Sequence, residues 1–294
     1  MNESIRRACV IGWPIGHSRS PIIHGHWLKK HGIAGEYGKR AVKPDELEEF
    51  LLGLSAHGLV GCNVTVPHKE AAFRIITRAN PEGVSALARA LGAVNTVWLD
   101  EWGRVRADNT DVYGFMANFH EGAPDWRAAG KHVVIIGAGG AARAVVAGFS
   151  QEGVARVTLA NRTLEKAERL AQELAGIGEA ALAAAPLSAL PALLAEADVL
   201  VNTTSLGMSG QPPLNIDLSP LPDHAVVADI VYAPLKTALL EQAELRGLST
   251  VDGLGMLLHQ AVPGFAKWFG VRPEVTADLR ALVEADIERE QGGA

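Results

Sequence analysis

Cysteine is scarce in this chain, and long apolar runs are absent. The sequence of 294 residues contains two cysteines, Cys9 and Cys62, each inside an apolar, strand-like run. We therefore expect two buried, reduced thiols and no disulfide scaffold, which fits a cytoplasmic protein. None of the apolar runs reaches the roughly 18 residues of a membrane span, so we expect no membrane partner. The first seven residues precede only a short apolar run at 8–11, and we expect no signal peptide.

An excess of positive charge is also lacking. Lysine and arginine number 27 against 33 acidic residues, which gives a net charge of −6. This balance argues against a protein whose main task is to hold nucleic acid. What the sequence does contain is ordinary for a globular protein, with 48% hydrophobic and 20% charged residues. Its length allows a large core and predicts two domains.

Strand-like and helix-like patterns alternate along the chain, and a second series begins at about residue 131. Such alternation predicts right-handed βαβ units and an α/β fold with an open sheet in each of two domains. Residues 122–130 are the expected link between the halves. The strands expected in the first series are 7–12, 36–42, 59–66, 93–99 and 103–107, and those in the second are 131–136, 156–160, 198–202 and 225–231.

The last part of the chain carries helical patterns without strand partners. We expect helices at about 256–268 and 273–290, and we expect them to return to the first domain. The predicted division is therefore residues 1–112 with about 256–294 in one domain, and residues 113–255 in the other.

A glycine-rich turn follows the first strand of the second series. Residues 133–136 are apolar and run directly into Gly-Ala-Gly-Gly-Ala-Ala at 137–142. In dinucleotide-binding folds the first glycine permits a tight turn, the second lets the backbone approach a pyrophosphate, and a small third residue allows close packing. A plain strand-to-helix connection could have the same composition, but the next strand also lies at the right distance. We therefore expect a Rossmann-type domain that holds the cofactor at Gly137, Ala138, Gly139, Gly140 and Ala141.

The end of the next strand indicates which dinucleotide is bound. NAD-binding members of this fold carry an acid there for the ribose 2′-hydroxyl. Here the strand ends in Asn161, Arg162 and Thr163, and the first carboxylate is Glu165. An arginine with neutral polar neighbours suits a 2′-phosphate. The sequence therefore predicts NADP, although Asn161 or Thr163 could also serve only to cap the following helix.

A strand-to-helix corner at residues 63–69 has an unusual lysine. The segment Asn-Val-Thr-Val-Pro-His-Lys alternates like a strand, and Pro67 suits the first position of a helix. Lys69 is then expected in the first helical turn, where the backbone N–H groups disfavour a positive charge. Asn63 and Thr65 would point to the same side of the strand.

Five separate motifs, taken together, resemble shikimate dehydrogenase along nearly the whole chain. They are Gly-Trp-Pro-Ile-Gly-His-Ser-Arg-Ser-Pro at 12–21, the segment 63–69, Gly-Ala-Val-Asn-Thr at 92–96, Asn-Thr-Asp at 109–111 and Gly-Leu-Gly-Met-Leu-Leu-His-Gln at 253–260. The resemblance implies reversible, NADPH-dependent reduction of 3-dehydroshikimate to shikimate, a step of chorismate and aromatic amino acid biosynthesis. It also implies a substrate domain followed by an NADP-binding domain.

The resemblance further implies roles for individual residues. Ser18 and Ser20 would bind the substrate carboxylate, although Ser20 could also be only a helix cap. Lys69 would give and take the proton at the reacting oxygen, and Asp111 would orient it and bind substrate. The charge state of Lys69 stays open, because a carboxylate favours its charged form while burial and the helix end oppose it. The other substrate residues implied are Asn63, Thr65, Asn95, Tyr232 and Gln260, and the other cofactor residues are Thr204, Ser205, Ile230 and Gly253.

Three positions depart from the family pattern: Gly25 after His24, Val112 after the Asn-Thr-Asp motif, and Ala86. They leave the exact shape of the site and a minor cofactor contact open. His24 and His26 have no third ligand nearby in the sequence, and we expect no metal.

Two alternatives remain open. One is a relative that acts on quinate or on an aminated shikimate. Ser18 and Ser20 fit shikimate well, and Arg162 disfavours an NAD-linked quinate enzyme. The other is a catalytically silent, NADP-binding regulator, which the presence of both Lys69 and Asp111 argues against. The expected partner is the small-molecule substrate, with no nucleic acid, and the chain would be a monomer or a homodimer.

Overall fold

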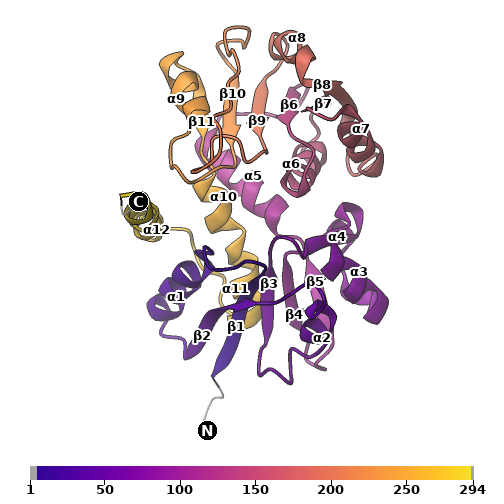
Figure 1. Cartoon of the computed structure of the whole chain (residues 1–294), viewed down its shortest axis with the longest axis vertical. Helices are drawn as coiled ribbons and strands as arrows, with labels where there is room; N and C mark the ends of the chain where they lie inside the picture. Colours follow the sequence, from indigo (N-terminus) through magenta and orange to yellow (C-terminus); the bar gives the residue numbers. More distant parts are fainter. Residues whose placement is uncertain (1–4, 293–294) are drawn as a thin grey trace. The chain divides into compact units, whose positions relative to one another are not determined.

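The computed structural model describes residues 5–292 and divides the chain into two compact α/β units (Figure 1). Among these residues, unit 1 comprises 5–110 and 260–283, and unit 2 comprises 111–259 and 284–292. The sequence placed the boundaries at 112/113 and 255/256, whereas the structure places them at 110/111 and 259/260. Residues 1–4, part of the segment in which no signal peptide is expected, lie outside the described residues.

Unit 1 contains a mixed sheet of five strands in the order β2-β1-β3-β4-β5. The first three strands along the chain are parallel, whereas β4 is antiparallel to both β3 and β5. The β4–β5 hairpin turns at Asp100, whose carboxylate accepts hydrogen bonds from the backbone N–H groups of Trp102 and Arg104. The strands are β1 (Arg6–Gly12), β2 (Gly35–Ala41), β3 (Gly61–Val64), β4 (Thr96–Leu99) and β5 (Val105–Asp108).

Helices cover the sheet of unit 1 with two separate apolar layers. One layer contains α1 and α11, whose Trp27, Phe265 and Trp268 are almost fully buried. The other contains α2 and α3, with residues such as Leu51 and Ile76 in one apolar cluster. The helices of the unit are α1 (Ser20–Lys30), α2 (Leu47–Leu52), α3 (Lys69–Ala79), the 3₁₀ turn η1 (Pro81–Gly83), α4 (Ala86–Leu91) and α11 (Ala261–Phe269).

The C-terminal helices behave partly as the sequence predicts. Helix α11 packs against β1, β3 and β4 of unit 1, which confirms the predicted return of this segment. The preceding helix α10 (Leu254–His259) instead packs against α5 of unit 2. The predicted single helix is interrupted because Pro263 lacks the N–H that would bond the carbonyl of His259. The division between the units falls inside the last helix, α12 (Ala277–Gly292).

Unit 2 contains a fully parallel sheet of six strands in the order β11-β10-β9-β6-β7-β8. This is the Rossmann strand order, in which the chain direction across the sheet reverses between β6 and β9. Ligands of such sheets bind beyond the carboxyl ends of the strands at that reversal. The strands are β6 (His132–Ile136), β7 (Arg156–Asn161), β8 (Ala181–Pro186), β9 (Val199–Asn202), β10 (Val226–Asp229) and β11 (Ser249–Val251).

Two apolar clusters hold the helices of unit 2 on its sheet. Phe115, Phe119, Trp126 and Phe149 form an aromatic group between α5, the segment after it and α6. Leucines from α8 and α9 form a second cluster with Val134 and Ile136 of β6, among other residues. The helices are α5 (Asp111–Gly122), α6 (Gly140–Gln151), α7 (Leu164–Glu173), the 3₁₀ turn η2 (Leu187–Ala189), α8 (Leu190–Leu194), α9 (Ala238–Leu245) and α10.

Two further findings concern residues 5–292 alone. Their helices include none that is both long and apolar enough to span a membrane. Their histidine, cysteine and acidic side chains form no group of three or more that could hold a metal ion.

Candidate functional site

The glycine-rich turn of unit 2 has the geometry of a phosphate-binding turn. Gly137 has a φ of +110°, and a Cβ there would lie 2.7 Å from Thr203 Oγ1, so glycine is required. A Cβ at Gly139 or Gly140 would meet nothing within 4 Å, which leaves open space above the backbone. Gly139 is the N-cap of α6 and supplies no side-chain cap, so the first N–H groups of that helix are available to an anion.

The end of β7 carries the polar residues predicted to select NADP. Asn161 ends the strand, and its Nδ2 donates to the carbonyl of Thr163 at 2.8 Å. Thr163 is the N-cap of α7, but its side chain makes no cap hydrogen bond. The structure therefore does not support the competing role for Thr163, in which its hydroxyl would cap α7. Arg162 is exposed beside them.

Polar side chains also gather where β9 and β10 end. Asn202 ends β9 and Asp229 ends β10, and Asn202 Nδ2 donates to Asp229 Oδ1 at 2.9 Å. The predicted cofactor residues Thr204 and Ser205 lie two and three positions after Asn202, and Ile230 directly follows Asp229. Since β9 adjoins β6, these loops lie at the same edge of the sheet as the glycine-rich turn. The glycine-rich turn and the loop after β9 flank the point where the strand order reverses, and the loop after β10 is next to them along the sheet.

Gly253 lies against the loop after β10. A Cβ at this position would come within 2.3 Å of the Ile230 carbonyl oxygen and 2.7 Å of the Val231 carbonyl oxygen. Glycine is therefore required by protein backbone, whether or not a nicotinamide also approaches there. Tyr232, the predicted substrate residue of the same loop, is half-buried.

Three of the predicted substrate residues of unit 1 belong to one hydrogen-bond network. Asn63 Nδ2 donates to the Asn95 carbonyl at 3.2 Å, and Asn95 Nδ2 donates to Gln260 Oε1 at 3.5 Å. Thr110 ties the network together, because its hydroxyl donates to the Gln260 carbonyl at 2.8 Å and its N–H donates to Asn95 Oδ1. Thr96 adds another hydroxyl, 3.1 Å from that of Thr110. The structure thus brings together residues that are up to 197 positions apart, from 63 to 260.

The two serines lie at the start of α1. Ser18 Oγ donates to Ser20 Oγ at 3.3 Å and accepts from the Ser20 N–H at 3.4 Å. Ser20 is the first residue of the helix and Arg19 is the N-cap, so the possibility that Ser20 is only a cap is wrong. The serine pair therefore presents hydroxyls beside the first N–H groups of a helix, an arrangement suited to a carboxylate.

Lys69 is the first residue of α3, as the sequence predicted for this corner. The route into the helix differs, however: β3 ends at Val64, and the Val66–Pro67 peptide is cis. Pro67 therefore lies in the turn and not at the first helical position. Lys69 is half-buried, and its carbonyl accepts from the Val94 N–H at 3.1 Å. This bond fixes the start of α3 to the segment that leads into Asn95.

Asp111 is the buried first residue of α5 and belongs to unit 2, whereas Lys69 belongs to unit 1. The helix begins at Asp111 itself, directly after Thr110 of the network in unit 1. Thr65, another residue of unit 1, is half-buried, and a Cβ at Gly12 would lie 2.7 Å from its methyl group. Pairing of Lys69 with Asp111 stays a prediction.

Sequence reasoning missed Tyr37. This residue of β2 donates from its hydroxyl to Asn63 Oδ1 at 2.6 Å, and its ring stacks on that of His24 with 3.9 Å between centroids. Burial raises the pKa of Tyr37 well above its ordinary value and lowers the pKa of His24 to about 3. His24 is therefore a neutral stacking partner. A tyrosine in an otherwise polar strand was the only signal, and it does not reveal its partners.

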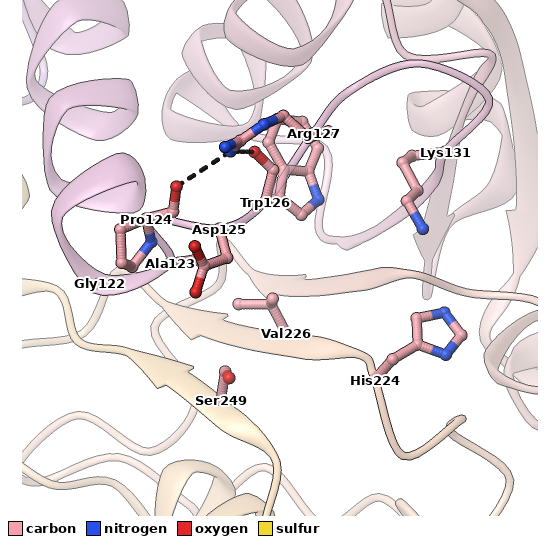
Figure 2. A pocket seen from close by; sticks show the side chains of 10 residues that line it. All are labelled: Gly122, Ala123, Pro124, Asp125, Trp126, Arg127, Lys131, His224, Val226 and Ser249. Carbon is pink, nitrogen blue, oxygen red and sulfur yellow. Dashed lines mark hydrogen bonds between the residues drawn. The ribbon is translucent and has the colours of Figure 1, made fainter.

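Unit 2 also contains a cavity of about 440 Å³. Figure 2 shows its wall, which includes Trp126, Lys131 and His224. Lys131 precedes β6 and His224 precedes β10, so the cavity opens at the amino ends of the strands. The glycine-rich turn and the loops after β9 and β10 lie at their carboxyl ends. This cavity contains none of the predicted site residues.

Family models match three parts of the chain. Residues 10–97 match the shikimate dehydrogenase substrate binding domain, residues 122–208 match shikimate / quinate 5-dehydrogenase, and residues 253–283 match the shikimate 5'-dehydrogenase C-terminal domain. The match at 10–97 lies in unit 1 and that at 122–208 lies in unit 2.

Similar proteins extend over nearly the whole chain. The shikimate dehydrogenase (NADP(+)) of Azorhizobium caulinodans is 53% identical over 96% of this chain and 97% of its own. The quinate dehydrogenase of Corynebacterium glutamicum in complex with NAD has a TM-score of 0.86 at 32% identity, covering 96% of this chain and 99% of that one. The shikimate 5-dehydrogenase of Thermus thermophilus in complex with NADP(H) and shikimate has a TM-score of 0.80 at 32% identity, covering 97% and 99%. The predicted resemblance is confirmed, and this chain belongs to the shikimate dehydrogenase family of oxidoreductases.

Proposed function

We propose that this chain is an NADP-dependent shikimate dehydrogenase that reversibly reduces 3-dehydroshikimate to shikimate. The observation that carries the proposal is the network of Asn63, Asn95 and Gln260, placed in the same unit as the Ser18–Ser20 pair. Amides and hydroxyls held by each other in this way suit a ring with several hydroxyls, and the serines suit its carboxylate. A site built to bond hydroxyls rejects analogues that lack them.

The cofactor of the proposal is NADP. The open backbone at Gly139 and Gly140 and the start of α6 suit a pyrophosphate, and Arg162 with Asn161 and Thr163 suits a 2′-phosphate. When bound, NADPH supplies a hydride to the carbonyl carbon of the substrate. Thr204, Ser205 and Ile230, in the loops after β9 and β10, and Gly253, after β11, would contact the cofactor.

Lys69 and Asp111 carry the proton chemistry in this proposal. Hydride addition leaves negative charge on the carbonyl oxygen, and the Lys69 ammonium donates a proton to that oxygen to form the alcohol. In the oxidation of shikimate the neutral Lys69 amine takes the same proton back. Asp111 orients the Lys69 side chain and bonds a ring hydroxyl, with Thr65 and Tyr232 as further substrate contacts. The reaction would serve chorismate and aromatic amino acid biosynthesis.

A quinate dehydrogenase is the second candidate. It is favoured by the similarity to the Corynebacterium glutamicum quinate dehydrogenase, whose structure contains NAD. Quinate lacks the ring double bond and carries an added hydroxyl at the carbon that bears the carboxylate. Arg162, in place of an acid at the end of β7, argues against an NAD-linked enzyme of this kind.

Steady-state kinetics with two substrates and two cofactors tests the proposal. The value of kcat/KM should be highest for shikimate with NADP, because NAD lacks the 2′-phosphate that Arg162 would bind. A higher value for quinate, or equal values with NAD, would favour the second candidate. Absence of NADPH formation with shikimate, quinate and an aminated shikimate would favour a catalytically silent NADP-binding protein.

A further inference from the structure

Asp229 is a buried carboxylate to which the proposed reaction assigns no role. It ends β10, and its side chain accepts three hydrogen bonds from three different segments. Oδ1 accepts from Asn202 Nδ2 at 2.9 Å and from the Val231 N–H at 3.0 Å, and Oδ2 accepts from Thr237 Oγ1 at 2.8 Å. The residue is only 2% exposed. A buried charge is costly unless donors surround it, and here the donors also connect separate pieces of backbone.

The first of these pieces is the loop after β9. Asn202 Oδ1 accepts from both the N–H and the hydroxyl of Thr204, at 3.0 and 2.8 Å. Asn202 Nδ2 donates to the Leu206 carbonyl at 3.2 Å as well as to Asp229. The side-chain amide of Asn202 therefore holds residues 204 and 206 of this loop in place. Asp229 connects this amide to β10, because it accepts one of the hydrogen bonds that Asn202 Nδ2 donates.

The second piece is the loop after β10. The bond from the Val231 N–H turns this loop immediately after Asp229, and Gly253 packs against the Ile230 carbonyl. Thr237, whose hydroxyl bonds Asp229, is also the N-cap of α9, where the loop ends. The Asp229 carboxylate thus holds both ends of the loop after β10 and, through Asn202, the start of the loop after β9.

We propose that Asp229 is a positioning residue that holds the loops after β9 and β10 in the form that binds NADP. This inference rests on the proposed cofactor, since Thr204, Ser205, Ile230 and Gly253 are the residues so held. Asp229 itself does not contact the cofactor in this scheme. The apparent affinity for NADP is reduced by the fraction of molecules whose loops are in the binding form.

Direct NADP binding to the full chain, measured by isothermal titration calorimetry, tests the inference. We expect Asp229→Ala to raise the Kd for NADP at least about tenfold, because all three acceptor bonds are lost. Asp229→Asn keeps the Oδ1 bonds and can donate to Thr237 Oγ1, so its Kd should stay within about threefold of the unchanged protein. The KM for shikimate at saturating NADP should rise by a smaller factor than the Kd for NADP in Asp229→Ala, since Tyr232 is the one proposed substrate contact in the loops that Asp229 holds.

Asp198→Asn is the matched control. Asp198 lies at the amino edge of the same sheet and also accepts three bonds, from Lys131 Nζ, the His132 N–H and His224 Nε2. Its loss should reduce stability without changing the Kd for NADP by more than about twofold. Circular dichroism at the assay temperature establishes that every variant is folded.

A folded Asp229→Ala protein that binds NADP as tightly as the unchanged protein would overturn the inference, and so would an equal loss of binding in Asp198→Asn. If Asp229→Ala does not fold, Thr237→Val removes one donor and should still weaken binding about threefold, while Thr237→Ser should not. Equal binding by these two variants would also overturn it. Failure of the unchanged protein to bind NADP would refute the proposed cofactor itself, which is a different result.

Discussion

Replacing Asp229 by asparagine removes a buried titrating group while keeping its shape. Burial raises the pKa of Asp229 from 3.8 to about 6, although the Val231 N–H, Thr237 and Asn202 act in the opposite direction. The folded state therefore binds a proton more tightly than the unfolded state does. Its contribution to stability is full below pH 3.8 and is lost as the pH rises through about 6. The pKa shift from 3.8 to about 6, at about 1.4 kcal/mol per pKa unit, corresponds to a total loss of about 3 kcal/mol in the free energy of unfolding. Roughly half of this loss falls between pH 5 and 8.

The assay is a urea titration of the unchanged protein and of Asp229→Asn at pH 5, 6, 7 and 8. Trp126 is the only tryptophan among residues 111–259, so its ¹⁹F NMR signal in protein labelled with 5-fluorotryptophan follows unit 2 alone. The quantity of interest is the difference in unfolding free energy between the two proteins. It should move in favour of the asparagine variant by about 1.4 kcal/mol from pH 5 to 8.

Asp198→Asn provides a control whose unfolding free energy, relative to the unchanged protein, should not depend on pH in this range. Burial raises the pKa of Asp198, but the donors from Lys131, His132 and His224 outweigh burial and hold the pKa below its ordinary value. Asp198 therefore contributes stability that is fully present above its ordinary pKa of 3.8 and is lost only as the pH falls below that value, so its difference curve should be nearly flat from pH 5 to 8. Parallel curves for the unchanged protein and Asp229→Asn over this range would refute the reasoning.

Three further predictions concern single side chains. Lys69→Ala should lower kcat by at least about 100-fold, with a change of less than about threefold in the KM for shikimate, and a near-normal kcat would remove Lys69 from the chemistry. Arg162→Ala should raise the KM for NADPH about tenfold and leave that for NADH nearly unchanged, and an equal rise for both cofactors would contradict the assignment of the 2′-phosphate. Cys9 and Cys62 are buried, and burial raises the pKa of Cys9 to about 12 and that of Cys62 well above its ordinary value. Neither thiol should react with Ellman's reagent until urea unfolds the protein, and immediate reaction of two thiols in the folded protein would show this account of burial to be wrong.

The sequence predicts those parts of the molecule whose determinants are local. The glycine-rich turn at 137–142 follows an apolar strand and precedes a helix, and each step can be inferred from neighbouring residues. Lys69 at the start of α3 is another example, because the polar helix begins where the alternating pattern ends. The α/β class and the Rossmann strands follow from the same kind of short-range periodicity.

Other features depend on residues far apart in the chain, and the sequence could not reveal them. The environment of Asp229 is set by Asn202 and Thr237, and nothing local distinguishes it from an ordinary strand-end aspartate. Ser20 fits the pattern of a helix cap, but the helix starts one residue earlier than a cap would require. Pro67 fits the first position of a helix, but α3 begins two residues later, at Lys69. In each case tertiary packing decided between two locally acceptable conformations.

The discontinuity of unit 1 has a consequence for the order in which the chain can fold during synthesis. Its sheet is made from residues 5–110, but the layer that contains Phe265 and Trp268 comes from α11, after all of residues 111–259. Trp268 Nε1 donates to the Val97 carbonyl at 2.9 Å, and a Cβ at Gly61 would meet the Trp268 indole. On the ribosome, the strands of both sheets therefore emerge before α11 does. The sheet of unit 1, although made first, has α1 but not α11 on one face until α11 emerges. Until then this partly uncovered face is exposed to aggregation or in need of a chaperone.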